Sequence, residues 1–505
     1  METPVIANLF RPHISRNACQ WLHHRPFPCC GIRGMRPVPL QRRAAATGSR
    51  YKTRTNDETK DAETSAWKQR MNILSQSKQD ECMRYPLITA DELRTQRERP
   101  KGVRMLLRDF IEDSLYNPFY GYFSKQVVIF SPGEPFHFNT MRDEIEFHKT
   151  LGDRYTAFED ALDQKEYDET RQLWHTPTEL FRPYYGQSIA DYLISNYKIS
   201  HYPYDDLIIY EMGAGNGTLM LNILDHIRAK DPEVYARTKF KIIEVSANLA
   251  SLQRKNISRS IYAGGHRERV EIINRSIFDW DTYVPSPCFF LALEVFDNFA
   301  HDAISYDMST HKPLQSMVFI DGEGEFYEYY TPKLDHLASR YLRLRRYISP
   351  PETLQFRMQR LWRSCKSLVP FTEKRTAPEY IPTRLMQFFD ILYKHFPAHR
   401  LIASDFHTLP DAVSGINAPV VQTRYRRRTI PVTTPLVHQG YFDILFPTDF
   451  NMMAAFYEHI TQKFPYVLSH EDFLRRWAYV EDTQARNGDN PLLTWYKNTS
   501  VMITR

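Results

Sequence analysis

The chain has 505 residues, 42% of them hydrophobic, which is enough for a substantial core and more than one small domain needs. Its net charge of +5 is uneven, because residues 1–55 sum to +9 and the remaining 450 residues to −4. A mildly acidic body lacks the basic footprint of nucleic-acid-binding proteins, and no apolar run of 18 or more residues predicts a membrane-spanning helix.

The first 55 residues are rich in arginine and poor in acids. They hold nine Arg and one Lys against one acid, Glu2, and no apolar stretch follows the charges. This composition is typical of a mitochondrial transit peptide and not of a secretory signal, although a disordered basic tail has the same features. We interpret residues 1–55 as a transit peptide and residues 56–100 as a linker and N-terminal extension. The expected location is the mitochondrial matrix.

Cysteine and histidine spacing predicts no metal site. Cys82, Cys288 and Cys365 lie beyond the leader and far apart, so neither a zinc site nor a disulfide framework can be built from them. No paired histidine motif stands out among the 18 His residues.

The segment 101–200 is predicted to be largely helical. Apolar residues recur at helical spacing from Val103 to Leu115, and a second amphipathic helix begins at Pro183. The charged stretch 131–172 between them carries no clear motif, and we interpret it as an insertion.

The most informative stretch is a glycine-rich turn that follows an apolar, strand-like run. The run ends in Glu211, and Gly213, Gly215 and Gly217 precede an apolar helical pattern. Strand, glycine turn and helix in that order form the first βα unit of a nucleotide-type fold, where glycines let the backbone approach a ligand. A dinucleotide site would have a further glycine where this chain has Thr218. An acid directly before G-x-G-x-G is the pattern of class I S-adenosylmethionine (SAM) methyltransferases.

Beyond this turn, strand-like and helix-like segments alternate. Short β-rich runs are predicted at 240–243, 270–273, 289–293 and 401–403. An arginine-rich, mostly helical stretch over 332–397 interrupts the alternation and is interpreted as an insertion. Alternating strands and helices predict a doubly wound α/β sheet, here a methyltransferase domain over 201–465 with a C-terminal extension over 466–505.

Acidic residues stand where the predicted strands end, which is where such sheets bind ligands. Glu244 ends the second strand, and a carboxylate there can accept hydrogen bonds from ribose hydroxyls. Asp279, in the turn after the third strand, would meet an adenine amino group or lie in a solvated turn. Glu294 and Asp297 follow the fourth strand. Paired acids suit a guanidinium acceptor, whereas helix capping or a buried salt bridge is the alternative.

Several short blocks between about residues 105 and 485 follow one another in a specific order. They are Phe110-Ile111 through Tyr122-Phe123, Thr176 to Glu179, Tyr185-Gly186-Gln187, the glycine motif through Met220, Glu244 to Leu249 with Gln253, Glu294-x-Phe296-Asp297, Ser404-Asp405-Phe406, and Gly440 to Asp443 with Asp449-Phe450. In these blocks the chain resembles the MidA-like family of SAM-dependent methyltransferases, whose mitochondrial branch are protein arginine methyltransferases serving complex I assembly.

The resemblance implies a Rossmann-like class I methyltransferase sheet with an N-terminal helical cover and a helical insertion, and SAM as the cofactor. The cofactor-binding residues expected from pattern and resemblance together are Gly186, Gln187, Glu211, Gly213, Gly215, Gly217, Glu244 and Asp279. Glu294 and Asp297 are expected to orient the acceptor. The implied reaction is methyl transfer to an arginine of a protein, with a respiratory-complex subunit as the expected substrate; no oligomeric state is implied.

Three other functions remain as alternatives. Leu293, where the family usually has a polar residue, and the large helical insertion 332–397 favour an assembly factor or scaffold that kept the fold without turnover. Asn216, where the family usually has Arg, loses a cation but leaves the turn possible. Thr218 and Glu211 count against a dinucleotide oxidoreductase. The run 424–428 could indicate RNA binding, but the acidic body favours a solvated turn.

Overall fold

The computed structural model describes residues 76–504 except 126, 258–264, 349–374 and 411–416. The chain divides into two units, Met1–Met83 and Arg84–Arg505. Of the first unit only residues 76–83 are described, all of them in helix α4 (Gln76–Arg84). The sheets and the cavity belong to the second unit. The predicted transit peptide, residues 56–75 of the predicted linker and N-terminal extension, and Cys365 lie outside the described residues. The transit peptide stays a prediction.

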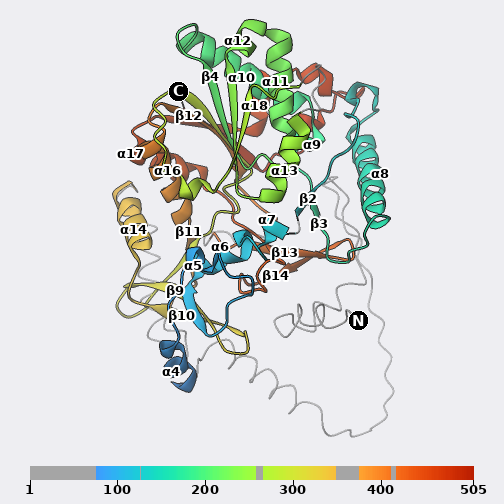
Figure 1. Cartoon of the computed structure of the whole chain (residues 1–505). Coiled ribbons are helices and arrows are strands. Elements are labelled where there is room, and N and C mark those ends of the chain that lie inside the picture. Colours follow the sequence, from blue (N-terminus) through green and yellow to red (C-terminus); the bar gives the residue numbers. More distant parts are fainter. Residues whose placement is uncertain (1–75, 126, 258–264, 349–374, 411–416, 505) are drawn as a thin grey trace, which may run out of the picture. The chain divides into compact units, whose positions relative to one another are not determined.

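A seven-stranded sheet lies at the centre of the second unit, in the order β16-β17-β12-β7-β4-β5-β6 (Figure 1). Five strands are parallel: β4 (Leu207–Met212), β5 (Thr238–Glu244), β6 (Val270–Asn274), β7 (Cys288–Leu293) and β12 (His399–Phe406). On the β12 side, β17 (Thr499–Thr504) pairs antiparallel with β12, and β16 (Pro465–Ser469) pairs antiparallel with β17. The predicted doubly wound α/β sheet and its strands are confirmed.

The order of the strands indicates where on the sheet a ligand would bind. From β4 the chain proceeds outward to β5 and β6, then returns to the other side of β4 with β7 and β12. The direction therefore reverses between β4 and β7. In doubly wound sheets the carboxyl ends of strands at such a reversal leave a crevice for a ligand.

Helices pack against both faces of this sheet (Figure 1). One face carries α10 (Tyr184–Ser200), α11 (Thr218–Lys230) and α18 (His470–Trp477). The other carries α14 (His336–Ile348), α16 (Thr383–His395) and α17 (Phe450–Thr461). Adjacent residues of β7 point to opposite faces, since Phe289 belongs to the first core and Phe290 to the second.

The stretch 332–397, interpreted from sequence as a helical insertion, contributes directly to this core. Its helix α16 buries Phe388, Phe389 and Leu392 against the sheet. The short strand β11 (Glu379–Ile381) also falls within it. Residues 349–374 of the stretch lie outside the described residues.

A second sheet, which the sequence analysis did not predict, stands beside the first. It contains β1 (Val103–Leu106), β8 (Asp302–Tyr306), β9 (Pro313–Ile320), β10 (Phe326–Thr331) and β11. The expected helix from Val103 to Leu115 is wrong in its first turn, because α6 (Leu107–Tyr116) begins only after β1. Val103 and Met105 are buried alternately and β1 pairs with β9, so strand periodicity and pairing prevail there.

The insertion 131–172 contains the long helix α8 (Glu144–Asp163) and begins β3 (Gln172–Trp174), which pairs with β2 (Val127–Ile129). A three-stranded sheet of β14 (Arg428–Val432), β13 (Val420–Tyr425) and β15 (Asp443–Leu445) lies nearby. Other short helices of the described ranges are α5 (Ala90–Leu93), α7 (Tyr122–Lys125), α9 (Pro177–Leu180), α12 (Pro232–Ala236) and α19 (Pro491–Thr494).

The arginines of the β13–β14 hairpin bind α8. Arg424 Nη1 lies 2.6 Å from Glu159 Oε1, and Arg427 Nη1 lies 2.7 Å from Asp160 Oδ1. Arg426 pairs with Glu169 at 3.2 Å. These arginines are therefore engaged within the protein, which argues against the RNA-binding alternative. No helix of the described ranges is long and apolar enough to span a membrane.

Candidate active site

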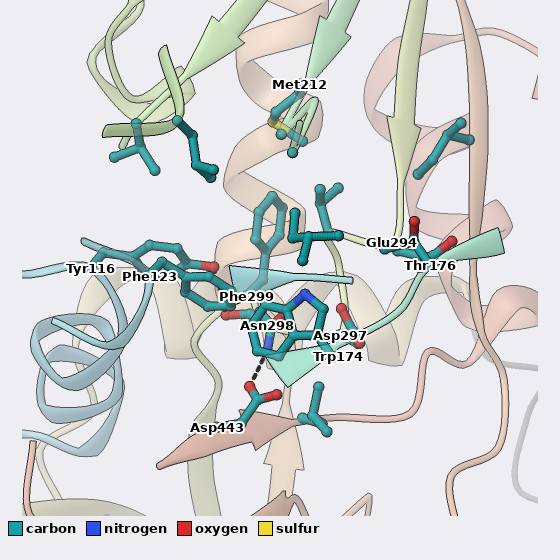
Figure 2. Close-up of a pocket in the computed structure, with 18 of the residues that line it drawn as sticks. Tyr116, Phe123, Trp174, Thr176, Met212, Glu294, Asp297, Asn298, Phe299 and Asp443 are labelled. Atoms are coloured by element: carbon teal, nitrogen blue, oxygen red, sulfur yellow. Dashed lines mark hydrogen bonds between the residues drawn. The ribbon is translucent and has the colours of Figure 1, made fainter. Parts of the chain in front are cut away.

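A cavity of about 980 Å³ opens at the carboxyl ends of β4, β5 and β7 (Figure 2). The glycine turn and the strand-end acids line one side. The segment before α10 lines another, and the three-stranded sheet contributes a third wall. The described residues contain no group of three His, Cys, Asp or Glu placed to hold a metal ion.

The glycine turn needs its glycines for backbone shape. Gly213, Gly215 and Gly217 have φ of 71°, 52° and 78°, in the left-handed region that side chains disfavour. A Cβ on Gly213 would lie 2.7 Å from Val295 Cγ1, and one on Gly215 would lie 2.8 Å from Ile129 Cδ1. Gly213 and Gly215 line the cavity, whereas Gly217 begins α11 and does not.

Two buried carboxyls stand beside this turn. Burial raises the pKa of Glu211 to about 8, with a smaller contribution from neighbouring Glu244. Burial likewise raises the pKa of Glu244 to about 7. Glu244 Oε1 accepts from Ser246 N and Oε2 from Gln253 Nε2, both at 2.9 Å. Glu211 Oε2 has no hydrogen-bond partner among the described residues, so the cavity offers an unused buried acceptor.

Gly186 and Gln187, expected to contact the cofactor, do not line the cavity. Both lie on α10, where a Cβ on Gly186 would come within 2.5 Å of Asn222 Cβ on α11. The glycine thus permits the two helices to approach closely. The structure gives Gly186 a packing role.

Asp279 lines the cavity but its carboxylate is already engaged. Asp279 Oδ2 accepts a hydrogen bond of 2.7 Å from Arg94 Nη1. Arg94 follows the short helix α5. This ion pair joins the N-terminal segment to the turn after β6.

Glu294 and Asp297 lie in the turn after β7, held by the end of β12. Glu294 has φ of 54°, and its backbone nitrogen donates to Ser404 O at 2.8 Å. Asp405 Oδ2 accepts from the backbone nitrogens of Val295 at 3.1 Å and Phe296 at 2.8 Å. Asp405 therefore fixes the turn that carries the two predicted acceptor residues.

A further buried acid, which the sequence analysis did not single out as a site residue, lines the cavity near Asp297. Asp443, on β15, accepts from Asn298 Nδ2 at 3.0 Å (Figure 2). Burial raises its pKa to about 7. Burial, and then the neighbouring Asp405, hold the pKa values of Glu294 and Asp297 well above their usual range.

These three carboxyls, Glu294, Asp297 and Asp443, have no counter-charge. No described lysine, arginine or histidine pairs with any of them, and Asp297 Oδ1 lacks a hydrogen-bond partner. Burying several acids together is unfavourable unless a cation joins them. This end of the cavity, which we call the acid cluster, is suited to a cationic ligand.

Aromatic rings border the acid cluster (Figure 2). Tyr116 and Phe123 stack with centroids 5.3 Å apart, and Trp174 lies 5.6 Å from Phe123. The Tyr116 hydroxyl donates to Asn298 O at 3.1 Å. These rings come from α6, α7 and β3, so the N-terminal segment forms a wall at the acidic end. We call Tyr116, Phe123 and Trp174 the aromatic wall.

A doubly wound sheet, an acid and a glycine turn after its central strand, and a cavity at the strand ends define the class of nucleotide-type α/β proteins. The sequence model of a family described as "Putative S-adenosyl-L-methionine-dependent methyltransferase" matches residues 188–467, more than half of the chain. The chain belongs to this family of SAM-dependent methyltransferases, and SAM is its cofactor.

Two relatives illustrate the similarity. The protein arginine methyltransferase NDUFAF7 homolog, mitochondrial, of Schizosaccharomyces pombe is 25% identical over 393 residues, which cover 74% of this chain and 80% of that protein. A methyltransferase-like crystal structure from Burkholderia thailandensis, bound to S-adenosyl-homocysteine, is similar with a TM-score of 0.47 at 14% identity, covering 80% of this chain and 88% of its own.

Proposed function

We propose that this SAM-dependent methyltransferase modifies arginine residues of a protein in the mitochondrial matrix and serves respiratory complex I assembly. The acid cluster beside the glycine turn carries the proposal for arginine. The name of the fission-yeast relative supports an arginine acceptor and a mitochondrial location. The arginine-rich leader supports the matrix, and the resemblance to the MidA-like family supports the role in complex I assembly.

In this proposal the glycine-turn end of the cavity holds the cofactor. The residues fit it, because side chains at Gly213 and Gly215 would intrude and Glu211 Oε2 is an unused acceptor. Glu244 would accept from ribose hydroxyls, and Asp279, with Arg94, would border the adenine. When bound, SAM supplies a methyl group made electrophilic by its sulfonium.

The acid cluster would bind and aim the acceptor. Carboxylates bind the planar donors of a guanidinium in pairs, which fixes its orientation as well as its position. A guanidinium nitrogen that gains a methyl group must lose a proton. Glu294 and Asp297 are suited to take it, because burial already favours their protonated forms. Positioning is then the main contribution of the protein to the rate.

A catalytically degenerate assembly factor with the same fold is the second candidate. Leu293, which lines the cavity directly before Glu294, favours it because an apolar side chain there offers no hydrogen bond to an acceptor. This candidate requires neither methyl transfer nor an intact acid cluster.

Full-length protein, methyl-labelled SAM and peptides carrying one arginine test the proposal. We expect label in arginine, none when that arginine is replaced by lysine, and loss of label in Asp297→Asn with SAM affinity kept. Calorimetric titration of SAM, with Glu244→Ala as the variant expected to lose binding, reports the cofactor end separately. SAM binding with no transfer to any arginine in a mitochondrial extract would favour the degenerate candidate.

A further inference from the structure

A buried carboxylate outside the sheet touches the glycine turn. Glu179 belongs to α9, and the hydroxyl of Thr176 accepts from its backbone nitrogen at 3.3 Å. Its side chain is 2% exposed. Glu179 Oε1 accepts from Asn216 Nδ2 at 2.9 Å and from Thr218 Oγ1 at 2.7 Å. Glu179, which lies in the N-terminal segment, therefore holds the glycine turn by two hydrogen bonds.

The same carboxylate borders the cavity and lacks a well-placed cation. Glu179 lines the cavity together with Gly213, Gly215 and Asn216. Its nearest basic group is Arg182, whose Nη1 lies 3.4 Å from Glu179 Oε2. Charge-assisted hydrogen bonds usually span about 2.7–2.9 Å. Arg182 also donates through Nη2 to Gly133 O, so it compensates Glu179 only partly.

The cofactor brings a cation to this end of the site. SAM carries an ammonium on its amino-acid portion, the part that such a glycine turn passes under. A buried carboxylate gains most from a cation that arrives with its own hydrogen-bond donors. We propose that Glu179 binds the ammonium of the amino-acid portion of SAM, so that the turn and the cofactor share one carboxylate.

Glu211 is the competing acceptor for that ammonium. It is also buried beside the turn, but none of the described residues donates a hydrogen bond to its Oε2, and burial raises its pKa to about 8. Glu179 instead accepts from two uncharged donors and one arginine and donates to none. A carboxylate in a setting made only of donors is the better partner for a cation.

The inference rests on the cofactor end of the proposed function and not on the arginine acceptor. Its test uses three ligands with full-length protein: S-adenosylhomocysteine, the same molecule with the amino group replaced by hydrogen, and 5′-methylthioadenosine, which lacks the amino-acid portion. Glu179→Gln removes the charge but keeps an acceptor oxygen for the turn. Exposed Glu166→Gln is the matched control.

We expect Glu179→Gln to weaken S-adenosylhomocysteine binding about tenfold to a hundredfold, as for loss of a charged hydrogen bond. The deaminated ligand should bind wild type and variant equally, and so should 5′-methylthioadenosine. Unchanged binding of 5′-methylthioadenosine also shows that the variant is folded. Asn216→Ala and Thr218→Val, which remove only the turn contacts, should weaken all three ligands alike.

Two results would overturn this inference and leave the proposed function intact. One is an equal loss for all three ligands in Glu179→Gln, which would make Glu179 a support of the turn. The other is no loss for any of them. If wild type binds none of the ligands, the proposed cofactor end itself is wrong and the inference falls with it. Methylation of arginine or of another acceptor is decided separately by the labelled-peptide experiment.

Discussion

Asp405 Oδ2 lies 2.8 Å from the backbone nitrogen of Phe296, so a carboxylate at the end of β12 holds the turn at the end of β7. Asp405 does not itself line the cavity. It acts on the site through the backbone that carries Glu294 and Asp297, and its charge also raises the pKa values of these two carboxyls. The geometry of the acid cluster is therefore set by a neighbouring strand.

We expect Asp405→Ala to lower methyl transfer more than SAM binding. The substitution leaves buried N–H groups of the turn without a partner, at a cost of about 1–3 kcal/mol in the free energy of unfolding. Asp405→Asn keeps an oxygen that can accept from the turn and should retain most of the activity. Urea denaturation and calorimetric titration of SAM measure the two effects. Full activity in Asp405→Ala would contradict the positioning role.

The buried carboxyls of the ligand-free protein should contribute stability that is lost as pH rises from about 4 toward 8. Unfolded carboxyls titrate near pH 4, to within about one unit. Burial raises the folded pKa of Glu211 to about 8 and those of Glu244 and Asp443 to about 7. The folded state then holds more protons than the unfolded state in this range, so raising the pH favours unfolding.

Denaturant titrations between pH 5 and 8 test this dependence, and Glu211→Gln should flatten it. Saturating SAM should restore stability at the upper end, because a ligand that binds only the folded state stabilises it. Stability that rises across this range would show that the buried carboxyls do not dominate the pH response.

Gly215→Ala should abolish tight SAM binding while leaving the protein folded. Its φ of 52° costs an alanine roughly 1–2 kcal/mol, and the new methyl group would enter the cavity. Gly133→Ala is the matched control, because Gly133 has φ of 79° and open space around its Cβ. Both variants should lose similar stability in urea denaturation, but only Gly215→Ala should lose SAM affinity, by tenfold or more. Equal SAM affinity in the two variants would contradict this role of the turn.

Trp174→Leu should weaken acceptor binding without changing SAM binding. The aromatic wall borders the acid cluster, and a ring face attracts a cation by about 0.5–2 kcal/mol. We expect KM for an arginine peptide to rise severalfold, with kcat and the Kd of SAM nearly unchanged. Trp477→Leu, on α18 and outside the cavity, is the control. A change confined to the Kd of SAM would show that the aromatic wall contacts the cofactor and not the acceptor.

The parts of the fold and site that the sequence predicted are those encoded locally. The apolar run, Glu211 and the three glycines are contiguous, so strand, turn and helix could be recognised together. Glu244 and Glu294 were found because parallel strands bring their carboxyl ends to one edge, whatever connects them. These predictions needed only the periodicity of short segments.

The missed parts depend on contacts between distant residues. Asp443 meets Asn298 across 145 residues of sequence, and no local pattern ties the two. Glu179 reaches Thr218 across 39 residues from a separate helix. β1 was mistaken for a helix because Val103, Leu106 and Leu107 stand at helical spacing, whereas Val103 and Met105 stand at strand spacing. Only the pairing with β9 decides between the two. Gly186 stays a predicted cofactor contact, although it does not line the cavity and its missing side chain serves the packing of α10 on α11.

Strand β17 follows every other described strand in sequence, yet it lies inside the sheet, between β12 and β16. A chain synthesised from its N-terminus must therefore wait for residues 499–504 before β12 loses its open edge. Until then β12 presents unpaired backbone groups, a template for pairing with other chains. Tyr496, three residues before β17, lines the cavity, so this part of the cavity wall is also synthesised late. Loss of a few residues at this point would create an aggregation hazard and not merely a shorter protein.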